Sequence, residues 1–194
     1  MNGVVVRLLA AMTLAIASIG ASAQAVELEG VKFEPTVQVG GAALQLNGAG
    51  LRTRVFFKVY VAGLYVPQKA NNAAALLAQK GPRRVAITML RNVDSDTFSA
   101  SLVEGLKNNL SEAQFTGFKA QIDALNANFK AAGEAKKGDV IHLEFAPDGG
   151  TRVIVNGKAQ GSAIAGEEFY TAVLRIWLGD KPADADLKKG MVGA

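Results

Sequence analysis

The chain has 194 residues, with 21 Lys or Arg against 17 Asp or Glu, which gives a formal net charge of +4 at pH 7. It has no cysteine and one histidine, which excludes a disulfide framework, thiol chemistry and metal sites built from clustered His and Cys. The basic residues are scattered and few aromatic residues lie among them, which argues against nucleic acid as a partner.

Residues 1–25 are predicted to form a cleavable secretory signal peptide. Arg7 supplies the positive charge, Leu8 to Ile19 form an apolar run, and small residues permit cleavage after Ala23 or Ala25. The apolar run is shorter than the roughly 20 residues of a membrane-spanning helix. We therefore expect a periplasmic or secreted protein with no stable membrane span after cleavage, with an uncleaved anchor as the alternative.

Residues 26–194 are predicted to form one domain, because their number suits a single core. Its first part alternates strand patterns with turn residues. Strands are predicted over Val26–Phe33, Thr36–Val39, Ala43–Leu46 and Leu51–Val66. The dipeptide Asn47-Gly48 is predicted to be a turn that leads into the long last strand, which Pro67 ends.

The remainder mixes helices with three further strands. Helices are predicted over Asn71–Gln79, Asp94–Leu110, Ser111–Gly133, Gly166–Leu178 and Asp184–Met191. Strands are predicted over Arg83–Arg91, Asp139–Ala146 and Thr151–Val155, and a tight turn at Asn156-Gly157. This order indicates an α+β fold, a large antiparallel sheet with helices on one side.

The Leu51–Val66 segment carries the most specific signal for function. Its even-numbered face holds Arg52, Arg54, Lys58 and Tyr60 among apolar side chains, and its odd-numbered face is almost purely apolar and is the expected core side. A face that is both cationic and apolar suits an amphipathic anion, such as a carboxylate with a hydrocarbon body. Arg52 and Tyr60 can meet only if the chain turns between Thr53 and Phe57. The alternative is an exposed strand face with ordinary surface cations.

Several kinds of catalytic site find no support in the sequence. The glycine-rich stretches lead into strands, so no phosphate-binding loop is expected. Asp94 and Asp96 are interpreted as acids that begin a helix, and His142 as a half-exposed residue of a strand. We expect no metal and no cofactor.

The chain resembles the chalcone isomerase-like family, specifically its secreted bacterial branch. The matching segments are Gly48-Ala49-Gly50-Leu51-Arg52, Phe57 to Val66, Val85 to Met89, and Ile164 to Asp180 with Pro182 and Leu187-Lys188 after it. The resemblance implies an open-faced β-sandwich, in which a large antiparallel sheet carries a helical layer and a ligand cleft lies between them.

That family contains true isomerases and non-catalytic members that bind fatty acids. The arginine after the glycine turn, shared by both, matches Arg52, with Arg54 as the alternative alignment. Tyr60 resembles the fatty-acid-binding members, in which an arginine and a tyrosine hold the carboxylate, whereas the isomerases have a threonine there. The isomerases also use a tyrosine and an asparagine seven residues apart on a helix, where this chain has Phe98 and Gly105.

We therefore expect a non-catalytic protein that binds a fatty acid or a similar amphipathic carboxylate. Arg52 and Tyr60 would bind the head group, and Phe98 and Leu102 would contact the apolar tail. One alternative is an isomerase or lyase that acts on a phenolic ketone. Another is a structural or partner-binding envelope module without a ligand, and the oligomeric state stays open.

Overall fold

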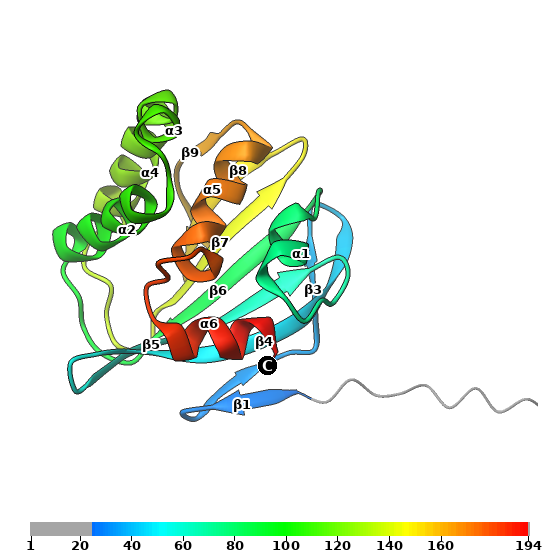
Figure 1. The fold of residues 1–194 in the computed structure, drawn as a ribbon. Helices are drawn as coiled ribbons and strands as arrows, with labels where there is room; N and C mark the ends of the chain where they lie inside the picture. Colours follow the sequence, from blue (N-terminus) through cyan, green and yellow to red (C-terminus); the bar gives the residue numbers. More distant parts are fainter. Residues whose placement is uncertain (1–24, 194) are drawn as a thin grey trace, which may run out of the picture.

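The computed structural model describes residues 25–193, so the predicted signal peptide lies outside the described residues apart from Ala25. Seven strands form one sheet in the order β3-β4-β5-β6-β7-β8-β9, and each is antiparallel to its neighbours (Figure 1). These strands are β3 Thr36–Val39, β4 Ala42–Arg54, β5 Phe57–Val66, β6 Arg83–Met89, β7 Val140–Ala146, β8 Gly150–Val155 and β9 Lys158–Ile164. A separate hairpin consists of β1 Val26–Leu28 and β2 Val31–Phe33.

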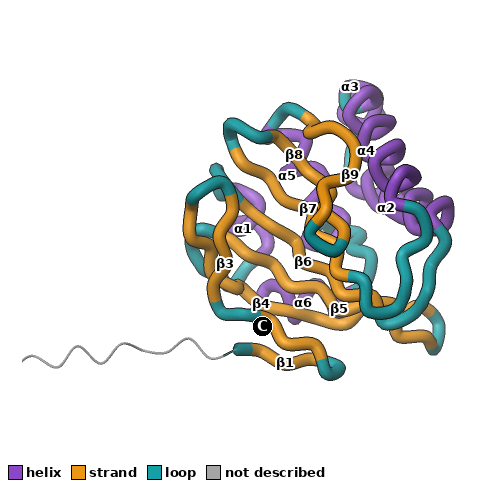
Figure 2. The backbone as a smooth tube through the Cα atoms, turned by 180° about the vertical axis from the view of Figure 1, so that it is seen from behind, coloured by secondary structure: helices purple, strands orange, loops and turns teal. Residues whose placement is uncertain are grey.

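The helices lie on one side of this sheet, as the view from behind shows (Figure 2). They are α1 Ala73–Ala78, α2 Ser95–Asn109, α3 Glu112–Gly117, α4 Lys119–Ala132, α5 Glu167–Leu178 and α6 Ala185–Val192. The predicted α+β class, with a large antiparallel sheet and a helical layer, is confirmed.

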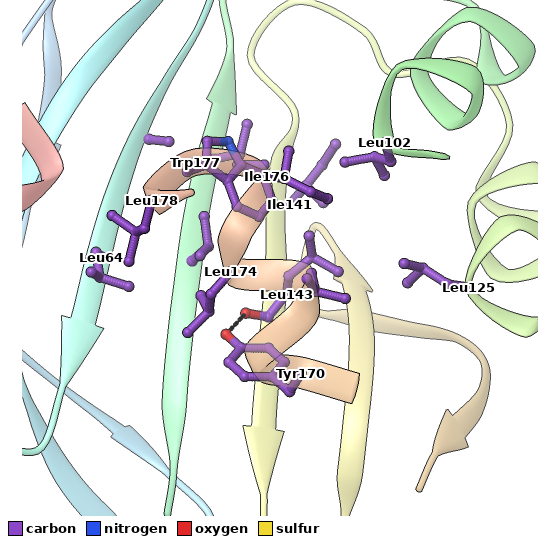
Figure 3. Packing of buried hydrophobic residues seen from close by; sticks show 14 of the residues in the cluster. Leu64, Leu102, Leu125, Ile141, Leu143, Tyr170, Leu174, Ile176, Trp177 and Leu178 are labelled. Atoms are coloured by element: carbon purple, nitrogen blue, oxygen red, sulfur yellow. Dashed lines mark hydrogen bonds between the residues drawn. The ribbon is translucent and has the colours of Figure 1, made fainter. Parts of the chain in front are cut away.

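The main core lies between the sheet and α5. Phe169, Tyr170 and Trp177 of α5 are completely buried, and the Tyr170 hydroxyl donates a hydrogen bond of 2.8 Å to the Leu143 carbonyl oxygen (Figure 3). The polar group of this tyrosine is thereby satisfied inside an apolar environment. Such burial on a single helix makes α5 the central element of the helical layer.

The opposite face of the sheet is partly covered by the β1–β2 hairpin. Phe33 packs there against Val61 and Tyr65 of β5. The even-numbered face of β5, with Tyr60 and Leu64, contacts the main core. Both faces of β5 are therefore buried. The prediction that the odd-numbered face is the core side is wrong, because the main core lies against the even-numbered face and a smaller cluster covers the odd-numbered face.

The predicted strand Leu51–Val66 is a hairpin and not a single strand. The chain reverses at Val55-Phe56, which places Arg54 opposite Phe57 and Arg52 opposite Tyr60. Val55 adopts a φ of 58°, a conformation that β-branched residues rarely adopt. This turn was not predicted from the sequence because its residues are apolar, whereas turns are usually recognised by Gly, Asn and Pro.

The predicted turn at Asn47-Gly48 is also wrong, because β4 continues through it. Helix α6 packs so closely on this part of β4 that a Cβ on Gly48 would overlap the carbonyl oxygen of Gly190. The Asn47 amide donates to the Met191 carbonyl oxygen at 2.8 Å, and its own oxygen accepts from the Ala70 N–H at 2.8 Å. Asn47 and Gly48 therefore allow α6 to pack on β4, and they do not form a turn.

Three smaller differences concern element boundaries. Val26–Phe33 is a hairpin with its turn at Glu29-Gly30, where both φ angles are positive. The predicted helix Ser111–Gly133 breaks at Phe118 into α3 and α4. Strand β9 was not predicted, because its sequence is mostly exposed and has no apolar alternation.

Between residues 25 and 193, no helix has the length and apolar character needed to cross a bilayer. The same residues contain no cluster of His and carboxylate side chains that could hold a metal ion.

Replacing Gly190 with Ala is expected to lower the free energy of unfolding by about 1 to 3 kcal/mol, because the methyl group would push α6 away from β4. Urea unfolding followed by circular dichroism measures this change. Gly117→Ala is the control, because a Cβ there meets nothing within 4 Å, and it should leave stability unchanged or slightly higher. Equal stability of G190A and the wild type would contradict close packing of α6.

Alkaline pH should destabilise the protein through its three tyrosines, all of which are buried. Burial raises the pKa of Tyr60, Tyr65 and Tyr170, that of Tyr65 to about 12. The unfolded chain therefore loses these protons first, and the free energy of unfolding should fall as pH rises above about 10. Tyrosinate absorbance should appear only as the circular dichroism of the fold is lost. Gradual ionisation near pH 10 with the fold intact would contradict this.

Candidate functional site

A cleft of about 290 Å³ opens between the β4–β5 hairpin, the segment after β6 and the first half of α2. Its wall combines cationic, apolar and hydroxyl-bearing side chains. The residues that line it are Arg52, Arg54, Val55, Phe57, Val59, Arg91, Asn92, Val93, Asp94, Thr97, Phe98 and Ser101. Segments far apart in the sequence meet here because β6 pairs with β5 and leads directly into α2.

An irregularity in the pairing of β4 with β5 directs side chains of this hairpin toward the cleft. Arg52 pairs with Tyr60 and Thr53 pairs with Lys58, so Val59 is an extra residue in β5. Such a bulge re-aims side chains. Val59 consequently lines the cleft and joins the same buried cluster as Tyr60. The convergence of Arg52 and Tyr60, which required a turn between Thr53 and Phe57, is present in the structure.

Arg52 is the most informative residue of the cleft. Its guanidinium carbon lies 5.4 Å from the centre of the Tyr60 ring, which is a cation–π distance. Its Nε is buried and has no hydrogen-bond partner. A buried donor on a charged group costs free energy when it stays unpaired. Arg52 also lines the cleft, where an anionic group would meet the positive charge of its guanidinium.

Arg83 shows what a satisfied buried arginine looks like in the same fold. It is fully buried, and it donates to Glu167 at 2.9 Å, to Thr171 at 3.2 Å and to the Gly81 carbonyl oxygen at 3.1 Å. Glu167 neutralises its charge. Within residues 25–193, by contrast, Arg52 makes no ion pair. The nearby Asp184 carboxylate instead accepts from the Thr53 N–H and caps α6.

Tyr60 lies beneath Arg52 and not in the cleft wall. It is 2% exposed, and its hydroxyl oxygen accepts a 2.9 Å hydrogen bond from the Trp177 indole N–H. Burial raises the pKa of Tyr60, an effect that Arg52 and the indole N–H partly oppose. The phenol is therefore protonated at neutral pH and keeps its own O–H as a donor.

Two more guanidinium groups line the cleft. Arg54 is exposed at the end of β4, and Arg91 stacks on the Phe57 ring, with its guanidinium carbon 4.6 Å from the ring centre. Arg91 was missed by sequence reasoning, because only the pairing of β5 with β6 brings it beside Phe57. Of the two aligned candidates, Arg52 is the partly buried one and carries the unpartnered Nε, whereas Arg54 faces solvent at the rim.

Helix α2 contributes the opposite wall. Asp94 caps the helix by accepting from the Thr97 N–H at 2.8 Å, and this hydrogen bond lowers the pKa of the Asp94 carboxyl. Thr97, Phe98 and Ser101 follow on the same face at helical spacing. An ionised and already hydrogen-bonded carboxylate is a weak proton acceptor, so Asp94 is poorly suited to general base catalysis.

The predicted tail-contacting residues separate in the structure. Phe98 lines the cleft, and its ring centre lies 5.1 Å from that of Phe129. Leu102 lies outside the cleft wall and extends from α2 toward α5 in the core (Figure 3). Gly105 is buried against Ile176, and a Cβ there would lie 2.9 Å from its Cγ2. A larger side chain at 105 would therefore displace α5.

Other hollows are less suited to an amphipathic anion. A polar one of about 230 Å³ adjoins the cleft through Arg52 and Arg54 and includes Glu104 and Lys181. A larger one, about 480 Å³, lies against α3 and α5, and includes both Glu168 and Arg175. Both contain opposite charges that can satisfy each other. The cleft has three arginines without an ion pair within residues 25–193 against one carboxylate, Asp94, which caps α2.

Comparison with known proteins agrees with this architecture. Residues 25–193 match the family described as chalcone isomerase-like. Among solved structures, an Arabidopsis thaliana fatty-acid binding protein superposes with a TM-score of 0.65 at 15% identity, covering 87% of this chain and 96% of that one. At that identity the likeness concerns the fold. A search of curated proteins gave no match.

The hydrogen bond between Tyr60 and Trp177 can be measured by a double-mutant cycle. Tyr60→Phe leaves a buried indole N–H without its acceptor and should lower the free energy of unfolding by about 1 to 3 kcal/mol. Combined with Trp177→Phe, the loss should be smaller than the sum of the single losses, with a coupling of about 1 kcal/mol. Strictly additive losses would mean that the two groups do not interact.

Proposed function

The chain belongs to the chalcone isomerase-like family, and we propose that it is a non-catalytic member that binds a fatty acid or a similar amphipathic carboxylate in the cleft beside α2. The observation that carries this proposal is that Arg52, which makes no ion pair within residues 25–193, lines a cleft with aromatic walls. The similar fold of a plant fatty-acid binding protein supports the same class of ligand.

In this proposal Arg52 binds the head group. A guanidinium has a planar fork of donors that matches the two oxygens of a carboxylate, and it stays charged at any physiological pH. Because burial raises the pKa of Tyr60, the phenol beneath Arg52 is neutral and does not offset the charge of the guanidinium. Arg91 and Arg54 add positive charge at the rim, which favours an anion further.

The size of the cleft limits the ligand. At about 30 Å³ for a group the size of a water molecule, a volume near 290 Å³ holds on the order of ten non-hydrogen atoms. Phe57, Val59, Val93 and Phe98 provide the apolar contacts for a chain of that size. Each buried methylene adds about 0.8 kcal/mol, so the tail supplies affinity and the arginine selects the head group. A longer tail would extend through the open side.

The same residues favour binding over catalysis. Phe98 has no hydroxyl and Gly105 has no side chain at the two helix positions that matter in the isomerases, and Ile176 leaves no room at the second. The only carboxyl in the cleft wall among the described residues, Asp94, is occupied as a helix cap. A site that holds a carboxylate needs neither a base nor a proton shuttle.

We further propose that the protein acts in the periplasm or outside the cell. The support is the sequence of residues 1–25, with its basic start, apolar run and small residues before the two cleavage points. Mass spectrometry of the protein from its native host should show a chain that begins at Gln24 or Val26. A full-length chain would contradict cleavage.

Decanoate binding tests the proposed function. Calorimetry should show that Arg52→Ala weakens decanoate binding by about tenfold or more, because a hydrogen bond to a charged group is lost. Methyl decanoate, which has the same tail but no charge, should bind wild type and R52A alike. The control is Arg152→Ala, an exposed arginine on β8 that should change neither affinity.

Two results would count against this proposal. If decanoate bound wild type and R52A equally, Arg52 would not hold the head group. If the wild type instead cyclised chalcones above the uncatalysed rate, the protein would be an isomerase.

A further inference from the structure

The tip of the β4–β5 hairpin exposes three consecutive large apolar residues. Val55 is 76% exposed, Phe56 is 91% exposed and Phe57 is 59% exposed. The hairpin extends past the rest of the sheet, at the lower left of Figure 1. A contiguous apolar group of this kind on a soluble domain marks an interaction site more often than a chance exposure.

The shape of this tip is fixed by the strands behind it. Backbone pairing between β4 and β5 continues to Arg54 and Phe57, so only Val55 and Phe56 form the loop. Val55 sits at a φ of 58°, which is costly for a β-branched residue. Within the described residues, no side chain covers the Phe56 ring at 91% exposure. The tip is therefore a short two-residue turn that projects apolar side chains from the end of a paired hairpin.

Basic side chains surround the tip. Arg54 is the last residue of β4, and Arg91, just after β6, stacks on the Phe57 ring. Lys136 and Lys137 lie on the loop before β7, in which the Lys137 N–H donates to the Asn92 side-chain oxygen at 2.9 Å and the Gly138 N–H donates to the Met89 carbonyl oxygen at 2.8 Å. None of these four cations makes an ion pair within residues 25–193.

Most of the acidic groups nearby are ion-paired or hydrogen-bonded, whereas Glu134, two residues before Lys136, is exposed and makes no ion pair within residues 25–193. Glu29 pairs with Lys58 at 2.7 Å, and Asp96 pairs with Lys130 at 3.1 Å. Asp94 caps α2, and Asp139 accepts from the Lys136 N–H and from the Asn156 amide. Counting Arg52, five cations without an ion pair stand here against three carboxylates without one, Asp94, Glu134 and Asp139, so this end of the described chain keeps an excess of positive charge around its apolar side chains.

We propose that this end of the molecule docks on an anionic lipid bilayer, with Phe56 and Val55 inserted among the head groups. Exposed aromatic residues ringed by Arg and Lys match the amphipathic boundary of such a membrane, where cations meet lipid phosphates and rings enter the acyl region. A protein partner fits less well, because the apolar part is three residues wide and a stable protein interface needs roughly 800 Å² on each side.

Docking in this orientation would place the ligand cleft at the membrane surface. Arg54, Val55, Phe57 and Arg91 belong both to the tip and to the cleft wall. A carboxylate with an apolar tail could then pass between the bilayer and the cleft without crossing bulk water. This consequence rests on the proposed function, whereas docking itself does not.

Vesicle flotation tests the proposal with the purified mature protein. The wild type should float with phosphatidylcholine vesicles that contain phosphatidylglycerol, float much less with phosphatidylcholine alone, and lose binding as salt is raised. Phe56→Ser should weaken partition by about tenfold or more, because burial of one aromatic ring is lost. Arg54→Glu should weaken it only toward the anionic vesicles.

Matched substitutions elsewhere provide the controls. Lys69→Glu, just after β5 and at its opposite end, makes the same charge change, and Val26→Ser makes an apolar-to-polar change at another exposed site. Both should partition like the wild type, and circular dichroism should show that all four variants are folded.

The outcomes separate docking from ligand binding. The proposed docking is overturned if the wild type stays in solution with both kinds of vesicle. It is also overturned if K69E and V26S lose binding as much as R54E and F56S. In either case the exposed tip would be a contact site for a protein partner. Decanoate binding in solution would be unaffected by that result. Flotation with no decanoate binding would instead overturn the proposed function and leave docking in place.

Discussion

The candidate site depends on one guanidinium group, that of Arg52, which the protein partly buries and does not neutralise within residues 25–193. Arg52 lies over the Tyr60 ring, and Tyr60 is held in turn by the indole of Trp177 from the central helix. Arg83, in the same core, is satisfied by Glu167 and Thr171, so the fold is able to pair a buried arginine fully. The unpaired charge of Arg52 is therefore a feature of the cleft, and it is the basis of the proposal that an anion binds there.

The β4–β5 hairpin links this charge to the surface of the molecule. Its bulge at Val59 turns an apolar side chain into the cleft, while its turn carries Phe56 into solvent. The apolar cleft wall and the exposed apolar tip therefore both come from one short hairpin. A ligand with a charged head and an apolar tail, and a membrane with the same two properties, would thus be recognised by neighbouring parts of one hairpin.

Sequence reasoning predicted the α+β class, most helices and the even-numbered pair Arg52 and Tyr60, because helical and alternating periodicity are local signals. It failed where tertiary packing decides the local structure. Asn47-Gly48 has the sequence of a turn but accommodates α6, and Val55-Phe56 has the sequence of a strand but forms a turn. Arg91 and Trp177 join the site only through strand pairing and helix packing, which leave no trace in residue spacing.

The close approach of α6 to β4 has a consequence for a chain that is shortened at its C-terminal end. Glycines at 48, 50 and 190 let this last helix lie directly on the strand that carries Arg52, and Asp184 at its start holds the Thr53 N–H. A nascent chain that lacks residues 184–192 would leave that strand unsupported. The residues of α6 are not among those that line the cleft, so the contribution of this helix is to hold β4, the strand that carries Arg52, in position.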